Sequence, residues 1–131
     1  MKHSSIFILF ITLISISCKK EDSLQKLESP LVKIDQKILN FGKIKVGDTI
    51  KHTFSIKNIS DRKFIIDTVG TTCGCTTIKF TPDSVSRNQT AKIDVQYIAQ
   101  EPGKISKSVV VSGNTKSGFL TFYLRGTVVG K

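Results

Sequence analysis

The sequence is poor in the side chains from which most catalytic and metal sites are built. Its 131 residues include no tryptophan, two histidines and three cysteines. It contains no phosphate-binding glycine loop, no nucleophile elbow and no His-Glu-x-x-His motif. The carboxylates stand singly, in turns at Asp48, Asp61 and Asp83 or on a strand face at Asp94, so no acid–base pair stands out. The length excludes a two-domain enzyme, and we expect a protein that is not an enzyme and holds no cofactor.

Beyond residue 17 the chain also lacks the apolar spacing of three and four residues that helices need. Period-two alternation recurs instead, over residues 50–57, 91–97, 105–111 and 119–129. Two shorter candidate strands lie at 31–39 and 63–69. Turn-forming residues separate these strands at 40–42, 46–48, 58–62, 82–88, 100–103 and 113–118. Strands spaced by about ten residues, with turns between them, predict an all-β antiparallel sandwich of about seven strands over residues 31–131.

No apolar run is long enough to cross a membrane as a helix, which needs about 20 residues. The longest, Ile6 to Ile16, follows the positive start Met1-Lys2-His3 and is typical of a cleaved secretory signal over residues 1–17. Cys18 follows the small residue Ser17 at the end of this run, an arrangement that resembles a bacterial lipoprotein signal. We therefore expect Cys18 to be lipidated and to begin the mature protein. The alternative is an ordinary signal in which Cys18 is incidental.

The segment after Cys18 has the composition of a flexible tether, over residues 18–30. Its start, Lys20-Glu21-Asp22, resembles the surface-export signal of Bacteroidetes lipoproteins. A lipidated Cys18 would attach the protein to a membrane without spanning it. We expect a cell-envelope protein, at the outer membrane and exposed at the cell surface if the export signal acts.

Acidic residues are scarce, and the formal net charge is +10. The lysines are spread along the whole chain with no cluster of five and no interleaved aromatic motif, so nucleic acid is not an expected partner. An anionic lipid, an envelope polysaccharide or an acidic envelope protein is a better match for this charge. A merely solubilising role is the alternative.

Cys73-Gly74-Cys75-Thr76 is the one local motif that could carry chemistry. The two cysteines could form a disulfide in an oxidising compartment, ligate a soft metal such as copper(I), or pack as small apolar residues. Zinc normally takes four ligands, and His52 is the one further histidine of the mature chain, so a complete zinc site is not expected. The alternation at 50–57 makes His52 a half-buried core histidine, which becomes a candidate ligand if it approaches the cysteines.

Several segments in order resemble the domain-of-unknown-function 1573 family, whose bacterial and often lipidated envelope proteins are related to ASH/SPD-2/hydin Ig-like domains. The similarity is carried by residues 39–44, 46–48, 54–58, 73–76, 103–104, 109–114 and 124–128. The resemblance implies an Ig-like sandwich in the cell envelope, and it brings no catalytic residue, ligand or cofactor.

Three functions follow as hypotheses. The leading one is a membrane-tethered Ig-like module that binds or scaffolds another envelope component, for example at an exposed sheet edge. The second is copper handling or redox chemistry at Cys73 and Cys75. The third is a purely structural envelope protein.

Overall fold

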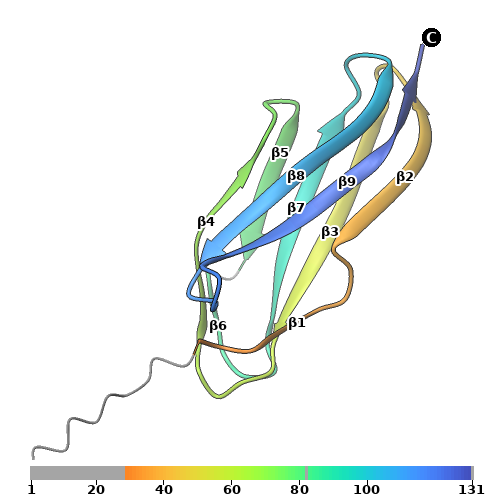
Figure 1. The fold of residues 1–131 in the computed structure, drawn as a ribbon. Helices are drawn as coiled ribbons and strands as arrows, with labels where there is room; N and C mark the ends of the chain where they lie inside the picture. The colour runs from red at the N-terminus through yellow and green to blue at the C-terminus, as the bar shows by residue number, and fades with distance from the viewer. Residues whose placement is uncertain (1–28, 82, 131) are drawn as a thin grey trace, which may run out of the picture.

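The computed structural model describes residues 29–81 and 83–130. The predicted signal peptide over residues 1–17, Cys18 and all but the last two residues of the predicted tether lie outside this part. The described chain is an all-β sandwich of two sheets (Figure 1), which confirms the predicted fold class. None of its segments is a helix that could span a membrane.

Within the described residues nine strands build the two sheets, whereas about seven were expected. They are β1 (Val32–Ile34), β2 (Ile38–Lys45), β3 (Thr49–Asn58), β4 (Phe64–Thr71), β5 (Thr76–Thr81), β6 (Ser84–Val85), β7 (Thr90–Ile98), β8 (Gly103–Gly113) and β9 (Phe119–Val129). Sheet A has the order β1-β3-β7-β5, and sheet B has the order β2-β9-β8-β4-β6. Among the described residues every pairing is antiparallel except that of β2 with β9.

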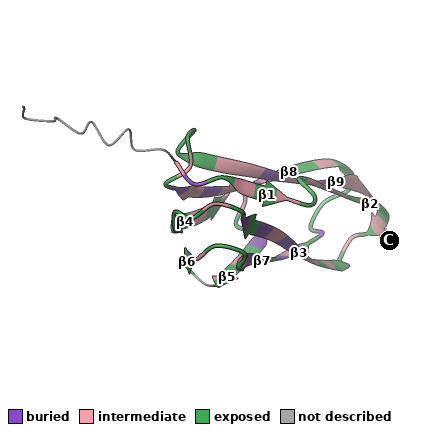
Figure 2. Ribbon diagram, turned by 90° about the horizontal axis from the view of Figure 1, so that it is seen from below, coloured by how far each residue is buried: buried purple, intermediate pink, exposed green. Residues whose placement is uncertain are grey.

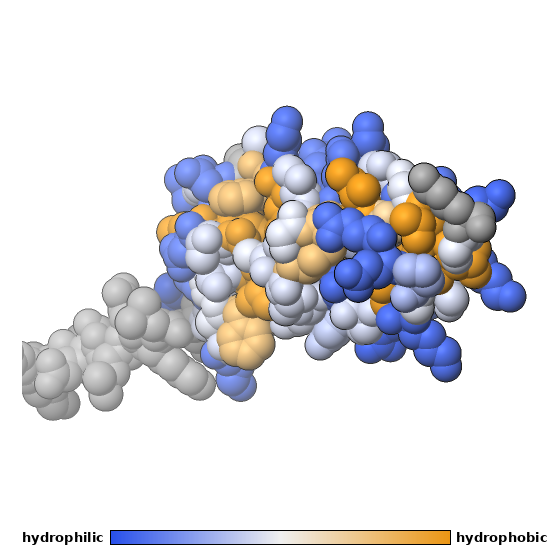
Figure 3. Space-filling view, turned by 90° about the horizontal axis from the view of Figure 1, so that it is seen from above, coloured by the Kyte–Doolittle hydropathy of each residue, from blue (hydrophilic) through white to orange (hydrophobic). Residues whose placement is uncertain are grey.

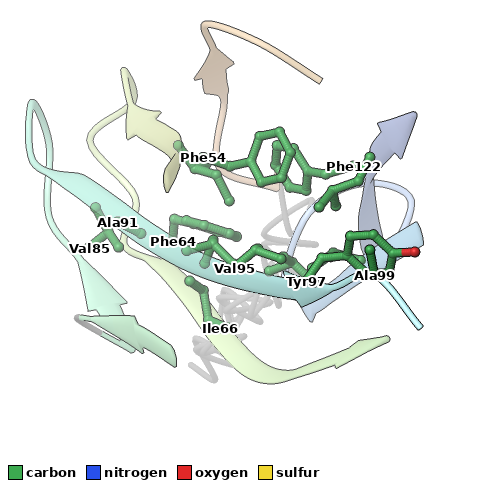
Figure 4. Packing of buried hydrophobic residues seen from close by; sticks show 14 of the residues in the cluster. Phe54, Phe64, Ile66, Val85, Ala91, Val95, Tyr97, Ala99 and Phe122 are labelled. Carbon is green, nitrogen blue, oxygen red and sulfur yellow. The ribbon is translucent and has the colours of Figure 1, made fainter. Parts of the chain in front are cut away.

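The core lies between the sheets because each long strand buries every second residue. The two layers are visible in Figure 2, with β8, β9 and β2 in one and β3, β7 and β5 in the other. Phe54 of β3 and Phe122 of β9 meet across the gap with ring centroids 4.8 Å apart (Figure 4). The other fully buried apolar residues include Ile56, Phe64, Val85, Ala91, Ile93, Val109, Val111 and Leu124.

The expected strand 31–39 and turn 40–42 are wrong in detail. The chain leaves sheet A after Ile34 and joins sheet B at Ile38, so two strands replace one. Residues 40–42 are an irregularity inside β2, where Asn40 pairs with Arg125 and Gly42 with Gly126. Gly42 adopts a φ of 73°, which glycine tolerates without steric cost. This backbone lets the intervening residue, Phe41, turn inward.

Phe41 occupies the space that Gly126 leaves by having no side chain. A Cβ on Gly126 would collide with the Phe41 ring, and the same ring stacks on Tyr97 at a centroid distance of 5.8 Å. The Leu-Asn-Phe-Gly and Leu-Arg-Gly segments, 85 residues apart in the sequence, are therefore one structural unit.

Strand β5 was not expected from the sequence. It is six residues long, and Ile78 and Phe80 face the core while Lys79 faces solvent. Two apolar residues in so short a segment are a weak alternation signal. Likewise, the predicted turn 82–88 contains the two-residue strand β6.

A buried amide organises the lower end of the sandwich, where β3 ends and β4 begins (Figure 1). Asn58 has no exposed surface. Its Nδ2 donates to the carbonyls of Arg62 (2.6 Å) and Val85 (2.8 Å), and its Oδ1 accepts from the backbone and side chain of Ser60 (both 2.9 Å). The Asn58 backbone is also bonded to the 86–89 turn in both directions. One residue thus joins the 58–63 loop to the 85–89 turn.

Replacing Asn58 by alanine should lower the free energy of unfolding by about 2–4 kcal/mol. The substitution leaves buried donors and acceptors without partners, each at a cost of about 1–3 kcal/mol. Urea unfolding measures this loss. Asn40→Ala, an exposed asparagine in β2, is the matched control and should change stability by less than about 0.5 kcal/mol. Equal stability of the two variants would contradict the role assigned to Asn58.

Candidate functional site

The Cys73-Gly74-Cys75 turn carries the chain from sheet B to sheet A, between the end of β4 at Thr71 and the start of β5 at Thr76. The two sulfur atoms lie at disulfide distance. The backbone N–H of Cys75 donates to Cys73 Sγ at 3.1 Å, and that of Thr76 donates to the Cys73 carbonyl at 3.2 Å. Both cysteines are half-buried.

The turn is fastened to both sheets. The backbone N–H of Thr72 donates to the Ser108 carbonyl of β8 at 3.3 Å, and that of Ile98 in β7 donates to the Cys75 carbonyl at 3.1 Å. A cross-link here closes a turn that is already held at its two ends. This geometry favours a local structural disulfide over a flexible, exposed pair of thiols.

His52 does not approach the cysteines. In the strand register it lies opposite Val95 of β7, which lies opposite Ile78 of β5. Cys75 is therefore two strands and three residues away, or about 14 Å between Cα atoms at ordinary strand spacings. Across residues 29–81 and 83–130, no three His, Cys, Asp or Glu residues gather as a metal site would require. Copper bound by the two sulfurs alone stays a prediction, and it would first require their reduction.

His52 is instead a half-buried histidine on the inner face of β3, as its alternation predicts. Its ring meets Phe54 edge-on at 4.6 Å. Its Nε2 is buried and has no hydrogen-bond partner within the described part of the chain. Burial lowers the pKa of His52 from its ordinary value of 6.5, because the charged imidazolium loses solvation there.

A hollow of about 490 Å³ lies on the outer face of sheet A. The register explains its lining, since Lys51 pairs with Gln96 and then Thr77, while Thr53 pairs with Asp94 and then Lys79. Alternation points all six side chains away from the core. The Thr53 hydroxyl donates to Asp94 Oδ1 at 2.6 Å, so the floor is polar and partly organised.

The outer face of sheet A is cationic. Five lysines project from it against one carboxylate, Asp94, and the lysines are Lys33, Lys51, Lys57, Lys79 and Lys92. No ion pair joins Asp94 to a lysine among the described residues, where the one ion pair is Arg87 with Asp61. The charge of Lys51 and Lys79 is thus available to a ligand. In the view from above, hydrophilic side chains also lie along the edges of the molecule (Figure 3).

Sequence reasoning did not single out this hollow. The lysines of three strands alternate with apolar residues, which marks them as solvent-facing, but their grouping depends on which strands are neighbours. That order is set by the crossover of the chain between sheets. The residue with the strongest sequence signal, Cys18, lies outside the described residues and remains a prediction.

Replacing Cys73 and Cys75 by serine should lower the free energy of unfolding by about 1–2 kcal/mol, since a cross-link over so short a loop removes little chain entropy. The far-ultraviolet spectrum should remain that of the β-sandwich because the core does not include the turn. Reducing agent should produce the same shift in the native protein and none in the double variant. Global unfolding of the variant would contradict a local role.

The lowered pKa of His52 should make stability depend on pH near neutrality. Below about pH 6.5 the unfolded chain binds more protons than the folded one, so stability should fall as the pH decreases through this value and level off above it. Thermal unfolding between pH 7.5 and 5.5 measures the slope. His52→Leu should flatten it, whereas Thr49→Ala on the same strand should not. An unchanged slope in His52→Leu would assign the effect to other groups.

Solved structures of low sequence identity share this fold. A protein of unknown function from Porphyromonas gingivalis W83 is similar with a TM-score of 0.65 and 12% identity, over 77% of this chain and 48% of that one. The ASH/PapD-like domain 7 of human CEP192 is similar with a TM-score of 0.62 and 14% identity, over 79% of this chain and 88% of that domain. The secreted serine protease VesC from Vibrio cholerae is similar with a TM-score of 0.60 and 12% identity, over 79% of this chain and 24% of that one. This chain therefore spans about half of the Porphyromonas protein and a quarter of the protease.

These structures establish the fold and no activity. No curated protein matches the sequence. A family model does match, over residues 32–128, and that range includes both cysteines of the turn and all the strands that line the hollow. The chain therefore belongs to the DUF1573 family of proteins of unknown function, as its motifs predict.

Proposed function

We propose that this chain is a lipid-anchored binding module of the bacterial cell envelope, without catalytic activity, and that the hollow on sheet A binds a carboxylated or phosphorylated polysaccharide. The observation that carries the proposal is the pair Lys51 and Lys79, which form no ion pair within the described residues and lie on either side of a polar floor.

The chemistry of the lining suits an anionic sugar polymer. Lys51 and Lys79 lie on β3 and β5 with β7 between them, so their strands are about 10 Å apart. Each ammonium group can donate three hydrogen bonds to carboxylate or phosphate oxygens. Thr53, Thr77, Gln96 and Asp94 offer partners for sugar hydroxyls. The volume of about 490 Å³ is in the range of small-ligand sites.

The face is a better binding surface than the adjacent edge. β5 is an edge strand of sheet A, and strand addition to such an edge was one expectation. Its exposed side chains are Thr77, Lys79 and Thr81, and a charged lysine on an edge strand disfavours pairing with another chain. The same lysine contributes to the hollow.

Membrane attachment through Cys18 forms the second part of the proposal. Acylation at this residue would hold the module at the envelope, and the Lys20-Glu21-Asp22 sequence supports the outer membrane and the cell surface. A copper or redox role at Cys73 and Cys75 is the alternative that remains, followed by a purely structural role. No further ligand assembles beside the cysteines in the described residues.

Replacing Lys51 and Lys79 by glutamine should weaken binding to polygalacturonate, a carboxylated polysaccharide, by about tenfold, since each exposed ion pair contributes about 0.2–1 kcal/mol. Isothermal titration calorimetry measures this, and 1 M salt should remove the binding because the Debye length is then about 3 Å. Lys43→Gln with Lys104→Gln is the matched control. These exposed lysines flank Thr127 on sheet B, and the control should bind within about twofold of the native protein.

Equal losses in the two double variants would show that net charge alone drives binding. Retained binding in 1 M salt, or equal binding of neutral dextran, would also count against an anion site at the hollow.

A further inference from the structure

Exposed apolar side chains gather at the lower end of the sandwich. Of the six large exposed hydrophobic residues in the described chain, four belong to this end: Leu31 (66% exposed), Phe119 (54%), Ile59 (47%) and Ile65 (43%). We call them the lower apolar group. They lie just before β1, in the β3–β4 loop, in β4 and at the start of β9 (Figure 1). The view from below in Figure 2 faces this end.

Ordered backbone presents these side chains. The N–H of Ile59 donates to the Leu31 carbonyl at 3.0 Å, and the N–H of Leu31 donates to Ser60 Oγ at 3.1 Å. Asn114 bonds the backbone of Ile65 in both directions, at 2.8 and 3.2 Å. Their exposure therefore belongs to the folded domain and is not a product of loose loops.

Cationic residues surround the lower apolar group. Arg62, Lys63, Arg87 and Lys116 are all exposed in the loops of this end, against the exposed carboxylates Asp61, Asp67 and Asp83. Asp61 is already paired with Arg87. Apolar side chains ringed by basic ones match the interfacial region of an anionic bilayer, where acyl chains lie beneath phosphate groups.

The path of the chain brings a membrane to the same end. The described segment that leads into β1 runs along the lower end of the sandwich (Figure 1). Cys18 is 11 residues before residue 29 in the sequence, and the tether expected from the composition would have an end-to-end distance of roughly 20 Å. An acyl anchor at Cys18 would hold the lower end nearer to the bilayer than the opposite end, which is about 35 Å away along the strands of β8 and β9.

We propose that the lower end docks on an anionic phospholipid bilayer, with Leu31, Ile59 and Phe119 in the interfacial layer and Arg62, Lys63 and Lys116 at lipid phosphates. This inference rests on the proposed anchor at Cys18. Docking fixes the domain upright on the membrane. The outer face of sheet A, with its hollow, then points parallel to the membrane surface, and its distance from the bilayer is fixed.

The absence of tryptophan from the chain gives this orientation a direct test. Single-tryptophan variants Ile59→Trp and Phe119→Trp of the full-length acylated protein are reconstituted into vesicles of phosphatidylethanolamine and phosphatidylglycerol that contain brominated lipid. We expect bromine to quench at least about half of the emission in both variants. Ile98→Trp, at a residue of comparable exposure (41%) near the cysteine turn, is the matched control and should keep its emission.

Intact mass separates the two proposals. A chain without acyl groups on Cys18 would refute the anchor, whereas an acylated chain whose Ile59→Trp and Phe119→Trp emission is unquenched would refute docking alone. Equal quenching of all three variants would show a domain without fixed orientation. Protection of the Phe119→Trp side chain from iodide without quenching by bromine would assign the lower end to contact with a second copy of the chain, the only other protein in the vesicles. Equal quenching of the three variants, and protection from iodide without quenching, would each overturn docking of the lower end on lipid.

Discussion

The lower end of the sandwich depends on one buried amide. Asn58 is the residue at which β3 stops, and its side chain replaces the backbone partners that the 58–63 loop and the 85–89 turn lack. Buried backbone groups without partners are costly, so the Asn58 side chain stabilises the closure of these loops over the core. Ile59, Arg62, Lys63 and Arg87 owe their positions to this arrangement. One buried polar residue thus positions the apolar and cationic side chains at the lower end of the sandwich.

The sequence predicted the strands best where one face of a strand is buried and the other is exposed to solvent. Strands β3, β7, β8 and β9 alternate because they have one buried face each, and alternation placed His52 on the inner face and Lys51 on the outer one. It failed for β5, which is short, and for residues 40–42, where an irregularity within β2 uses the same residue types as a turn. The change of sheet between Ile34 and Ile38 has no local signature, since it is set by pairing with β3 and with β9.

The candidate sites differ in the same way. Cys73 and Cys75 could be found from their spacing because a two-residue separation is itself a geometric constraint. The hollow could not, because Lys51, Asp94 and Lys79 become neighbours only through the order β3-β7-β5. The shared sandwich of the Porphyromonas protein, the human CEP192 domain and the protease VesC shows that the scaffold is compatible with very different chains.

The parallel pairing of β2 with β9 has a consequence for the biogenesis of the protein. In the described part of the chain β9 is the one neighbour of β2 and separates it from β8, so β2 cannot join sheet B before residues 119–129 are available. Contacts so distant in sequence also form slowly. In a chain synthesised from its N-terminus, β2 would therefore stay without its partner strand until residues 119–129 have been made. The topology itself thus delays the completion of sheet B, whose first strand in the sequence is the last to gain its partner.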